Sequence, residues 1–204
     1  MKSKLHLATI KNRLIQLAND KDSLIRVEAI AVLADFYDGD IDRQILKALE
    51  DKNSLVKIEA LEAIKLPINK DAVLEKISFF LKSRNWLIKA YAIEALGRNN
   101  ALQYKKEIKH ILKTTKNDEI KVRAYYALIK LGEVAYLNKL FELLDNDCFM
   151  VRKVTSNTLY YLADENNTTT ILEHLNKRLD KEAEYVVQET LKGTIKDIIN
   201  LNLI

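Results

Sequence analysis

The sequence predicts an all-α fold, a right-handed α-solenoid of about six helix-turn-helix repeats that form a single domain over residues 1–204. Three observations predict it. A 14-residue pattern recurs along the chain, amphipathic segments fill the intervals between its copies, and the 204 residues include only four Gly and one Pro. Because sheets and tight turns depend on Gly and Pro, this scarcity favours long helices.

The repeats are visible by direct comparison. The stretch DKDSLIRVEAIAVL, residues 20–33, returns as DKNSLVKIEALEAI at residues 51–64, and further copies begin at Ser83, Thr115 and Asn146. A small residue marks the same place in every copy: Ala29, Ala60, Ala92, Ala124 and Thr155. The steps between them are 31, 32, 32 and 31 residues, a spacing too regular to arise by chance.

Each copy predicts helix B, the second helix of a hairpin. In the first copy, apolar residues recur at steps of three and four, on one helical face: Ile25, Ala29, Leu33 and Phe36. Every copy also carries an apolar–basic pair: Ile25–Arg26, Val56–Lys57, Ile88–Lys89, Ile120–Lys121 and Val151–Arg152. We expect these bases to bond turn carboxylates or helix-end carbonyls; a row of phosphate ligands is the alternative. A sixth copy, residues 180–199, is degenerate, and its register is fixed only to within one residue.

The intervals between the copies predict helix A, the first helix of each hairpin. Six amphipathic segments fill them: residues 7–18, 43–50, 72–82, 104–114, 134–144 and 169–179. The turns that follow carry Asp, Asn and Ser, whose side chains can cap the first free N–H groups of helix B. One such hairpin cannot bury its apolar stripe alone, so consecutive hairpins are expected to stack and share a core.

These units resemble HEAT repeats. That family places an Asp in the turn, with an apolar residue and then Arg or Lys five and six positions later, as in Asp20, Ile25, Arg26 and in Asp51, Val56, Lys57. Later copies replace the Asp by Ser83, Thr115 and Asn146. The repeat length is similar to that of short HEAT-like repeats in bacterial proteins such as the phycobilin lyase subunits. The resemblance implies a fold that presents a binding surface, but it does not decide activity.

Composition and motifs argue against several functional classes. The single Cys148 cannot form an internal disulfide, which favours the reducing cytoplasm, and no stretch reaches the roughly 18 apolar residues of a membrane span. His6, His110 and His174 lie on three different A helices, so no metal site is predicted. No Gly-rich phosphate loop or nucleophile elbow occurs. We therefore predict no catalytic residue and no cofactor, and we do not expect an enzyme.

The charge distribution does not favour a nucleic-acid partner. The net charge of +4 is modest for 204 residues, whereas nucleic-acid binders concentrate more basic charge than this. A basic run, residues 104–116, lies on the fourth helix A. It is predicted to be a solvated outer face, with an electrostatic dock as the alternative.

The B helices are expected to line a concave wall that can hold a partner protein. With the core centred near Ile25, Ala29, Val32 and Phe36, the opposite side of each helix B is left free. The candidate partner-binding residues on this wall and its margin are Tyr91, Glu94, Val122, Tyr126, Ile129, Lys153, Asn157 and Tyr160. Tyrosine is enriched at protein interfaces because it combines a large contact area with a polar tip.

The leading hypothesis is a non-catalytic protein-binding scaffold, either an adaptor or an inhibitor, and a bacterial toxin-immunity protein is one specific form of it. Some HEAT-like solenoids are DNA glycosylases, so a nucleic-acid-binding enzyme is an alternative, although Glu62 and Glu94 on the wall would repel phosphates. A lyase-type chaperone for cofactor attachment is a second alternative, suggested by the repeat length.

The final segment, IKDIINLNLI, residues 195–204, is strongly apolar. Terminal repeats of an array need a polar outer face to stay soluble. Either the last helix folds back on the sixth repeat, or this end associates with another copy of the chain or with a partner.

Overall fold

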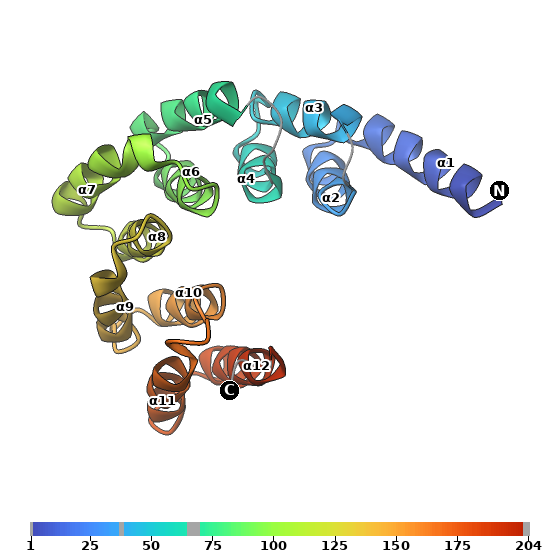
Figure 1. Ribbon diagram of the computed structural model, residues 1–204. Helices are drawn as coiled ribbons and strands as arrows, with labels where there is room; N and C mark the ends of the chain where they lie inside the picture. Colours follow the sequence, from blue (N-terminus) through green and yellow to red (C-terminus); the bar gives the residue numbers. More distant parts are fainter. Residues whose placement is uncertain (1, 37–38, 65–69, 202–204) are drawn as a thin grey trace. The chain divides into compact units, whose positions relative to one another are not determined.

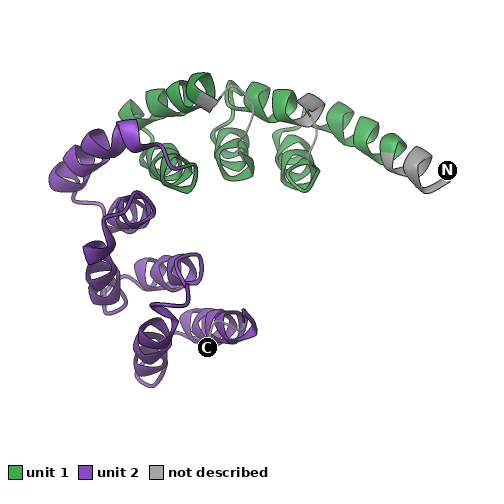
Figure 2. Ribbon diagram, in the orientation of Figure 1, with its two compact units in different colours: residues 1–99 green, residues 100–204 purple. Residues whose placement is uncertain are grey.

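A computed structural model describes residues 2–36, 39–64 and 70–201. This part of the chain contains twelve α-helices and three short 3-10 helices, with no strand. The helices form six hairpins, so the prediction of an all-α solenoid of helical repeats is confirmed. The chain divides into two compact units, residues 1–99 and 100–204 (Figure 2). The single domain expected from the sequence stays a prediction, and each unit is described by itself.

Unit 1 contains the first three hairpins (Figure 1). Its helices are α1 (Lys2–Leu17), α2 (Ser23–Leu33), α3 (Gly39–Ala48), α4 (Ser54–Ala63), α5 (Lys70–Ser78) and α6 (Trp86–Arg98), with a 3-10 turn, η1 (Phe79–Lys82), after α5. The odd-numbered helices are the A helices and the even-numbered helices are the B helices. Helix α4 packs against α2 on one side and α6 on the other, so the B helices of unit 1 form one layer.

Unit 2 contains the other three hairpins. Its α-helices are α7 (Lys105–Thr114), α8 (Asp118–Lys130), α9 (Leu137–Leu143), α10 (Phe149–Tyr160), α11 (Thr168–Leu179) and α12 (Tyr185–Asn200), and 3-10 turns η2 (Leu102–Tyr104) and η3 (Val134–Tyr136) precede α7 and α9. The B helix α10 packs between α8 and α12. The core of this unit includes Leu140, Leu159, Ile171 and Leu191, all fully buried.

The turn before each B helix uses the same polar contact in all six repeats. A side-chain oxygen accepts a hydrogen bond from the backbone N–H two residues later, at 2.8 to 3.2 Å. The accepting residues are Asp20, Asp51, Ser83, Thr115, Asn146 and Glu182. In four repeats the residue that donates this N–H then caps the helix with its own side chain: Asp22, Asn53, Asn85 and Asn117. These caps satisfy first-turn N–H groups and fix where each B helix begins.

This contact also fixes the register of the sixth repeat, which the sequence left open. Glu182 accepts from the N–H of Glu184, so Glu184 stands where Asp22 stands in the first repeat. Leu191 then matches Thr155, and 36 residues separate the two instead of 31 or 32. Part of the extra length lies in the connection between α10 and α11, residues 161–167.

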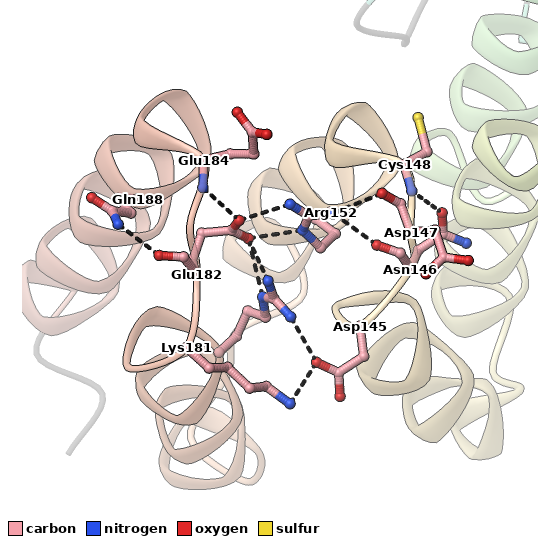
Figure 3. Close-up of polar contacts among 10 residues, drawn as sticks. Asp145, Asn146, Asp147, Cys148, Arg152, Lys181, Glu182, Glu184 and Gln188 are labelled. Atoms are coloured by element: carbon pink, nitrogen blue, oxygen red, sulfur yellow. Dashed lines mark hydrogen bonds and ion pairs between the residues drawn. The ribbon is translucent and has the colours of Figure 1, made fainter.

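Arginines of the repeating basic position clamp neighbouring repeats together. Arg26 binds both carboxylate oxygens of Asp51 at 2.7 and 2.8 Å and donates to the carbonyl oxygens of Asp20 and Lys21. Arg152 makes the equivalent bidentate contact with Glu182 at 2.7 and 2.8 Å, as Figure 3 shows. The predicted role of these two bases is therefore confirmed, and their guanidinium groups are occupied within the fold.

The buried side of helix B differs from the sequence expectation. In α2 the buried residues are Arg26, Ala29, Ile30 and Leu33. Ile25 and Val32, which were expected near the centre of the core, are exposed. In later repeats these places are buried, on α12 as well as on the B helices that lie between two others. A single-face helical pattern therefore describes the inner repeats poorly.

Candidate functional site

The two candidate residues in unit 1 are half-buried on α6. Tyr91 and Glu94 lie one turn apart on this helix. Glu94 forms an ion pair with Arg98 at 3.4 Å, and Arg98 also donates to the carbonyl oxygens of Leu61 and Glu62 on α4. Glu94 therefore takes part in the contact between two repeats, and its role in partner binding stays a prediction.

Two candidate residues on α8 do not lie on an open surface, which corrects the sequence-based placement. Val122 is completely buried and Tyr126 is only 5% exposed, and both belong to the hydrophobic core of unit 2. Their counterpart positions in α2, Val27 and Ala31, are half-buried. At the matching positions of α10, Lys153 is half-buried and Asn157 is exposed, so this side of a B helix is buried on α8 because an apolar and an aromatic side chain there pack into the core of unit 2.

The remaining candidates reach the surface of unit 2. Ile129 on α8 is half-buried beside the core. On α10, Lys153 and Tyr160 are half-buried and Asn157 is exposed. The three α10 residues recur at steps of four and three, so they share one stripe of the helix. The structure thus brings these three together, while their partner-binding role stays a prediction.

The basic run on the fourth helix A is partly neutralised. Lys105 and Lys109 on α7 both bind the Glu133 carboxylate, at 2.7 and 2.9 Å. The hydrogen bonds from Lys105 and Lys109 lower the pKa of Glu133 to about 2. Lys106 and Lys113 remain exposed on the same helix. The run therefore presents less net positive charge than its sequence suggests.

The repeats expose large apolar side chains at a place that the sequence analysis missed, the first turn of helix B. In unit 1 these residues are Leu24, Leu55 and Trp86, and in unit 2 they are Phe149, Met150, Tyr185 and Val186. All occupy the first or second residue of their helix. The signal was present in sequence as an apolar residue placed directly before the apolar–basic pair, as in SLIR, SLVK and FMVR. The sequence pattern assigned these residues neither to the core nor to the wall.

In unit 2 this row joins the exposed stripe of α10. The combined surface, called the α10–α12 face from here on, consists of Phe149, Met150, Lys153, Asn157, Tyr160, Tyr161, Tyr185 and Val186. At 100° per residue, its α10 members span an arc of about 120°, and the α12 members occupy the matching first turn of the neighbouring helix. Tyr185 is 73% exposed and Tyr161 is 61% exposed, and the Tyr160 and Tyr161 rings meet edge to face at 5.1 Å between centroids.

The chemistry of the α10–α12 face suits contact with another protein. It combines four aromatic rings, two aliphatic side chains, one amide and one ammonium group. The nearby strong charges are already paired: Glu182 binds Arg152 and Arg178, and Asp145 binds Arg178 and Lys181 (Figure 3). The hydrogen bond from Arg152 is the main cause that lowers the pKa of Glu182 to about 2.

The C-terminal end of the described chain remains partly apolar. Ile198 is buried in the core of unit 2, whereas Ile199 and Leu201 are exposed. Residues 202–204, which belonged to the predicted self-association segment, lie outside the described residues. Across residues 2–36, 39–64 and 70–201, no helix is long and apolar enough to span a membrane, and no three acidic, His or Cys side chains are grouped so that they could hold a metal ion.

Comparison with known proteins identifies the repeat. Residues 74–159 match the family model described as HEAT repeats. No curated protein matches the sequence significantly. Among solved structures, the complex of CpcE and CpcF of phycocyanin lyase from Nostoc sp. PCC7120 is similar with a TM-score of 0.50 and 12% identity, over 92% of this chain and 94% of that chain.

Two further structures show lower similarity scores. An engineered protein has a TM-score of 0.42 and 19% identity over 93% of this chain and 96% of that chain. An archaeal HEAT-like repeats protein from Thermococcus onnurineus NA1 has a TM-score of 0.41 and 16% identity over 92% and 86%. The match to HEAT repeats covers residues 74–159, and the similarity to the CpcE and CpcF complex, at 12% identity, shows the helical-repeat fold alone.

Proposed function

We propose that this protein is a non-catalytic scaffold that binds a partner protein through the α10–α12 face. The observation that carries the proposal is the exposed set of aromatic and aliphatic side chains at matching positions of two adjacent helices. Aromatic residues dominate the energetics of protein interfaces, and contiguous exposed apolar patches on soluble domains mark binding sites. The sequence-based candidates Lys153, Asn157 and Tyr160 supply polar contacts within the same surface.

The electrostatics support a protein partner over a nucleic acid. A surface that follows a phosphate backbone needs several free Lys or Arg side chains. Only Lys153 lies within the α10–α12 face, and neighbouring Arg152 and Arg178 are held by Glu182. The cores of protein interfaces are depleted of charge and enriched in Tyr, Phe and Met, which matches this surface.

The partner is expected to be neutral or acidic. The chain carries a net charge of +4, and associating proteins generally present complementary charge. An adaptor and an inhibitor both fit this description. An immunity protein that neutralises a toxin is one form of the inhibitor role, and it would require a target that is not strongly basic.

Affinity capture from the native host with matched variants tests the proposal. The test variant carries Phe149→Ala, Tyr161→Ala and Tyr185→Ala, which remove three rings from the α10–α12 face. The control variant carries Phe79→Ala, Leu102→Ala and Val134→Ala, which remove three exposed apolar side chains from other surfaces. Because all six side chains are exposed, both variants should fold like the wild type.

The expected result is one protein captured by the wild type and the control but lost from the test variant. With that protein purified, calorimetry should show binding weakened by about 100-fold or more in the test variant, since interface aromatic residues often contribute over 1.4 kcal/mol each. Retention of the same protein by the test variant would show that the chosen surface is wrong.

A direct DNA-binding measurement separates the proposal from the nucleic-acid alternative. Binding to duplex DNA is expected to be weak and non-specific, because few unpaired Lys and Arg side chains lie on one surface of the protein. Titration at several salt concentrations should give no saturable binding at physiological ionic strength. Tight binding with a steep salt dependence would instead support the glycosylase-type alternative.

A further inference from the structure

The first B helix exposes apolar side chains that are buried at the matching positions of later repeats. Ile25 is 39% exposed and Val32 is 44% exposed on α2. The counterparts of Ile25 are buried in both units: Val56, Ile88, Val151 and Val187. The counterparts of Val32 are buried as well: Ala63, Ala95, Thr158 and Thr194. In the repeat pattern, these two positions of α2 are therefore positions that are normally buried against a neighbouring helix.

A contact between α10 and α12 shows which element covers these positions in the sixth repeat. Ser156 on α10 donates a hydrogen bond to Thr194 on α12 at 3.2 Å, and both side chains are buried. Thr194 stands at the position of Val32 in the repeat. The side of a B helix that carries this position therefore faces the preceding B helix.

A second contact, in unit 1, also shows which side of a B helix faces the preceding B helix. Arg98 on α6 donates to the carbonyl oxygen of Leu61 on α4 at 2.7 Å. Arg98 stands at the position of Asp35, and Leu61 stands at the position that Ser156 occupies in the fifth repeat. Asp35 thus also belongs to the side that would face a preceding B helix.

These positions define the α2 stripe: Ile25, Glu28, Val32 and Asp35. Ile25, Glu28 and Val32 recur at steps of three and four on one side of α2, Asp35 follows in the turn directly after the helix, and all four are exposed. In Figure 1, α2 has α4 on one side and, among the described residues of unit 1, no B helix on the other. The stripe pairs two apolar side chains with two carboxylates, whereas a capping surface would be polar throughout.

The last B helix presents the complementary side. Lys192 on α12 stands where Ser156 stands on α10, and Ser156 is the residue that reaches the next B helix. The surrounding residues define the α12 stripe: Lys192, Ile195, Lys196 and Ile199. Ile199 and both lysines are exposed, and Lys192 forms an ion pair with the exposed Glu189 of its own helix at 2.8 Å. Two ammonium groups and two isoleucines thus match two carboxylates and two apolar side chains.

We propose that α12 of one molecule docks on α2 of a second copy of this chain, in the place of a preceding B helix. The repeat register puts Lys192 of one copy beside Val32 and Asp35 of the next, where its stem covers the valine and its ammonium group meets the carboxylate. Such a contact joins two different surfaces, so it is head-to-tail and repeats along a chain of molecules. It uses none of the residues of the α10–α12 face and is independent of the proposed partner binding.

Two complementary variants test the head-to-tail contact. The head variant, Ile25→Glu with Val32→Glu, keeps an intact α12 stripe, and the tail variant, Lys192→Glu with Ile199→Glu, keeps an intact α2 stripe. The control variant, Leu55→Glu with Phe79→Glu, changes two exposed apolar residues outside both stripes. Sedimentation equilibrium measures the mass of each protein over a range of concentrations, and circular dichroism checks its helix content.

The wild type and the control should gain mass as concentration rises. Each stripe variant alone should stay monomeric, with association weakened by about 100-fold because unpaired carboxylates would be desolvated at the contact. An equimolar mixture of the two variants should form dimers and nothing larger. The intact α12 stripe of the head variant can dock on the intact α2 stripe of the tail variant, and no other intact pair remains.

Three results would overturn the proposal: a wild type that is monomeric at every soluble concentration, a stripe variant that associates like the wild type, or a mixture that stays monomeric. A milder charge exchange covers the case in which a stripe variant loses helix content. Asp35→Lys alone should weaken association, and Asp35→Lys with Lys192→Glu in the same chain should restore it. Failure of that restoration counts against the contact as well.

Discussion

At the residue scale, the choice between Arg and Lys at the basic repeat position follows the turn of the next repeat. Arg26 meets Asp51 and Arg152 meets Glu182, each through two parallel hydrogen bonds. Where the next turn offers Asn146 instead of a carboxylate, the base is Lys121, which binds Asp118 of its own helix. Only the planar guanidinium can bind a carboxylate through two parallel bonds from two nitrogens, so Arg and the carboxylate occur together.

We expect the Arg152 clamp to contribute strongly to the stability of unit 2. The variant Arg152→Met should lower the free energy of unfolding by about 3 kcal/mol, because it leaves buried Glu182 with one fewer partner. The matched variant Lys121→Met removes a half-exposed pair and should cost less than about 1 kcal/mol. Urea denaturation measures both. Equal losses in the two variants would contradict the role of the clamp.

Glu182 also predicts a pH dependence. Its pKa is lowered from 4.5 to about 2 in the folded chain, chiefly by the hydrogen bond from Arg152. The stability gained from ionised Glu182 is therefore fully present above about pH 4.5 and is lost as the pH falls toward 2. The stability gap between the wild type and Glu182→Gln should shrink over this range. A gap that stays constant from neutral to acidic pH would contradict the lowered pKa.

At the element scale, the sequence predicted the helical hairpins well and their buried sides poorly. All six B helices were predicted from apolar residues at steps of three and four and from Asp, Asn and Ser in the turns that precede the helices. The wall residues Val122 and Tyr126 are buried in the core of unit 2, whereas Lys153 and Asn157 at the same positions of α10 are half-buried and exposed. Burial in a stack depends on which repeats lie beside a helix, and a periodicity within one helix does not contain that information.

The helix caps give a prediction at the same scale. Asn85 caps α6 with bonds to two backbone N–H groups, whereas Cys148 stands at the same position before α10 without a side-chain cap. Asn85→Ala should lower stability by about 1 kcal/mol, and Cys148→Asn should raise it by up to about 1 kcal/mol. Thermal unfolding of the two variants checks the opposite signs. Destabilisation by Cys148→Asn would show that the cap geometry of this turn differs.

At the scale of the whole molecule, the repeat pattern determines the fold class. It does not determine the candidate site, which consists of residues that differ from one repeat to the next. The sequence revealed all six repeats, but the register of the sixth needed the contact between Glu182 and the N–H of Glu184, because Glu stands there in place of the Asp, Ser, Thr or Asn of the earlier turns. The sequence predicted Lys153, Asn157 and Tyr160 as candidates, and these three lie on the α10–α12 face. Tyr161, Phe149 and Tyr185 were missed because an exposed apolar residue beside a core residue looks the same in sequence as a second core residue.

The measurement that tests the central claim most directly is hydroxyl-radical footprinting of the chain, alone and with its captured partner. In the free chain, Met150, Tyr161 and Tyr185 should be modified rapidly and Tyr126 slowly, in line with their exposure. With the partner bound, we predict protection of Met150, Tyr161 and Tyr185 and unchanged modification of exposed Phe79. Unchanged modification at all three residues of the α10–α12 face, with protection elsewhere, would contradict the account.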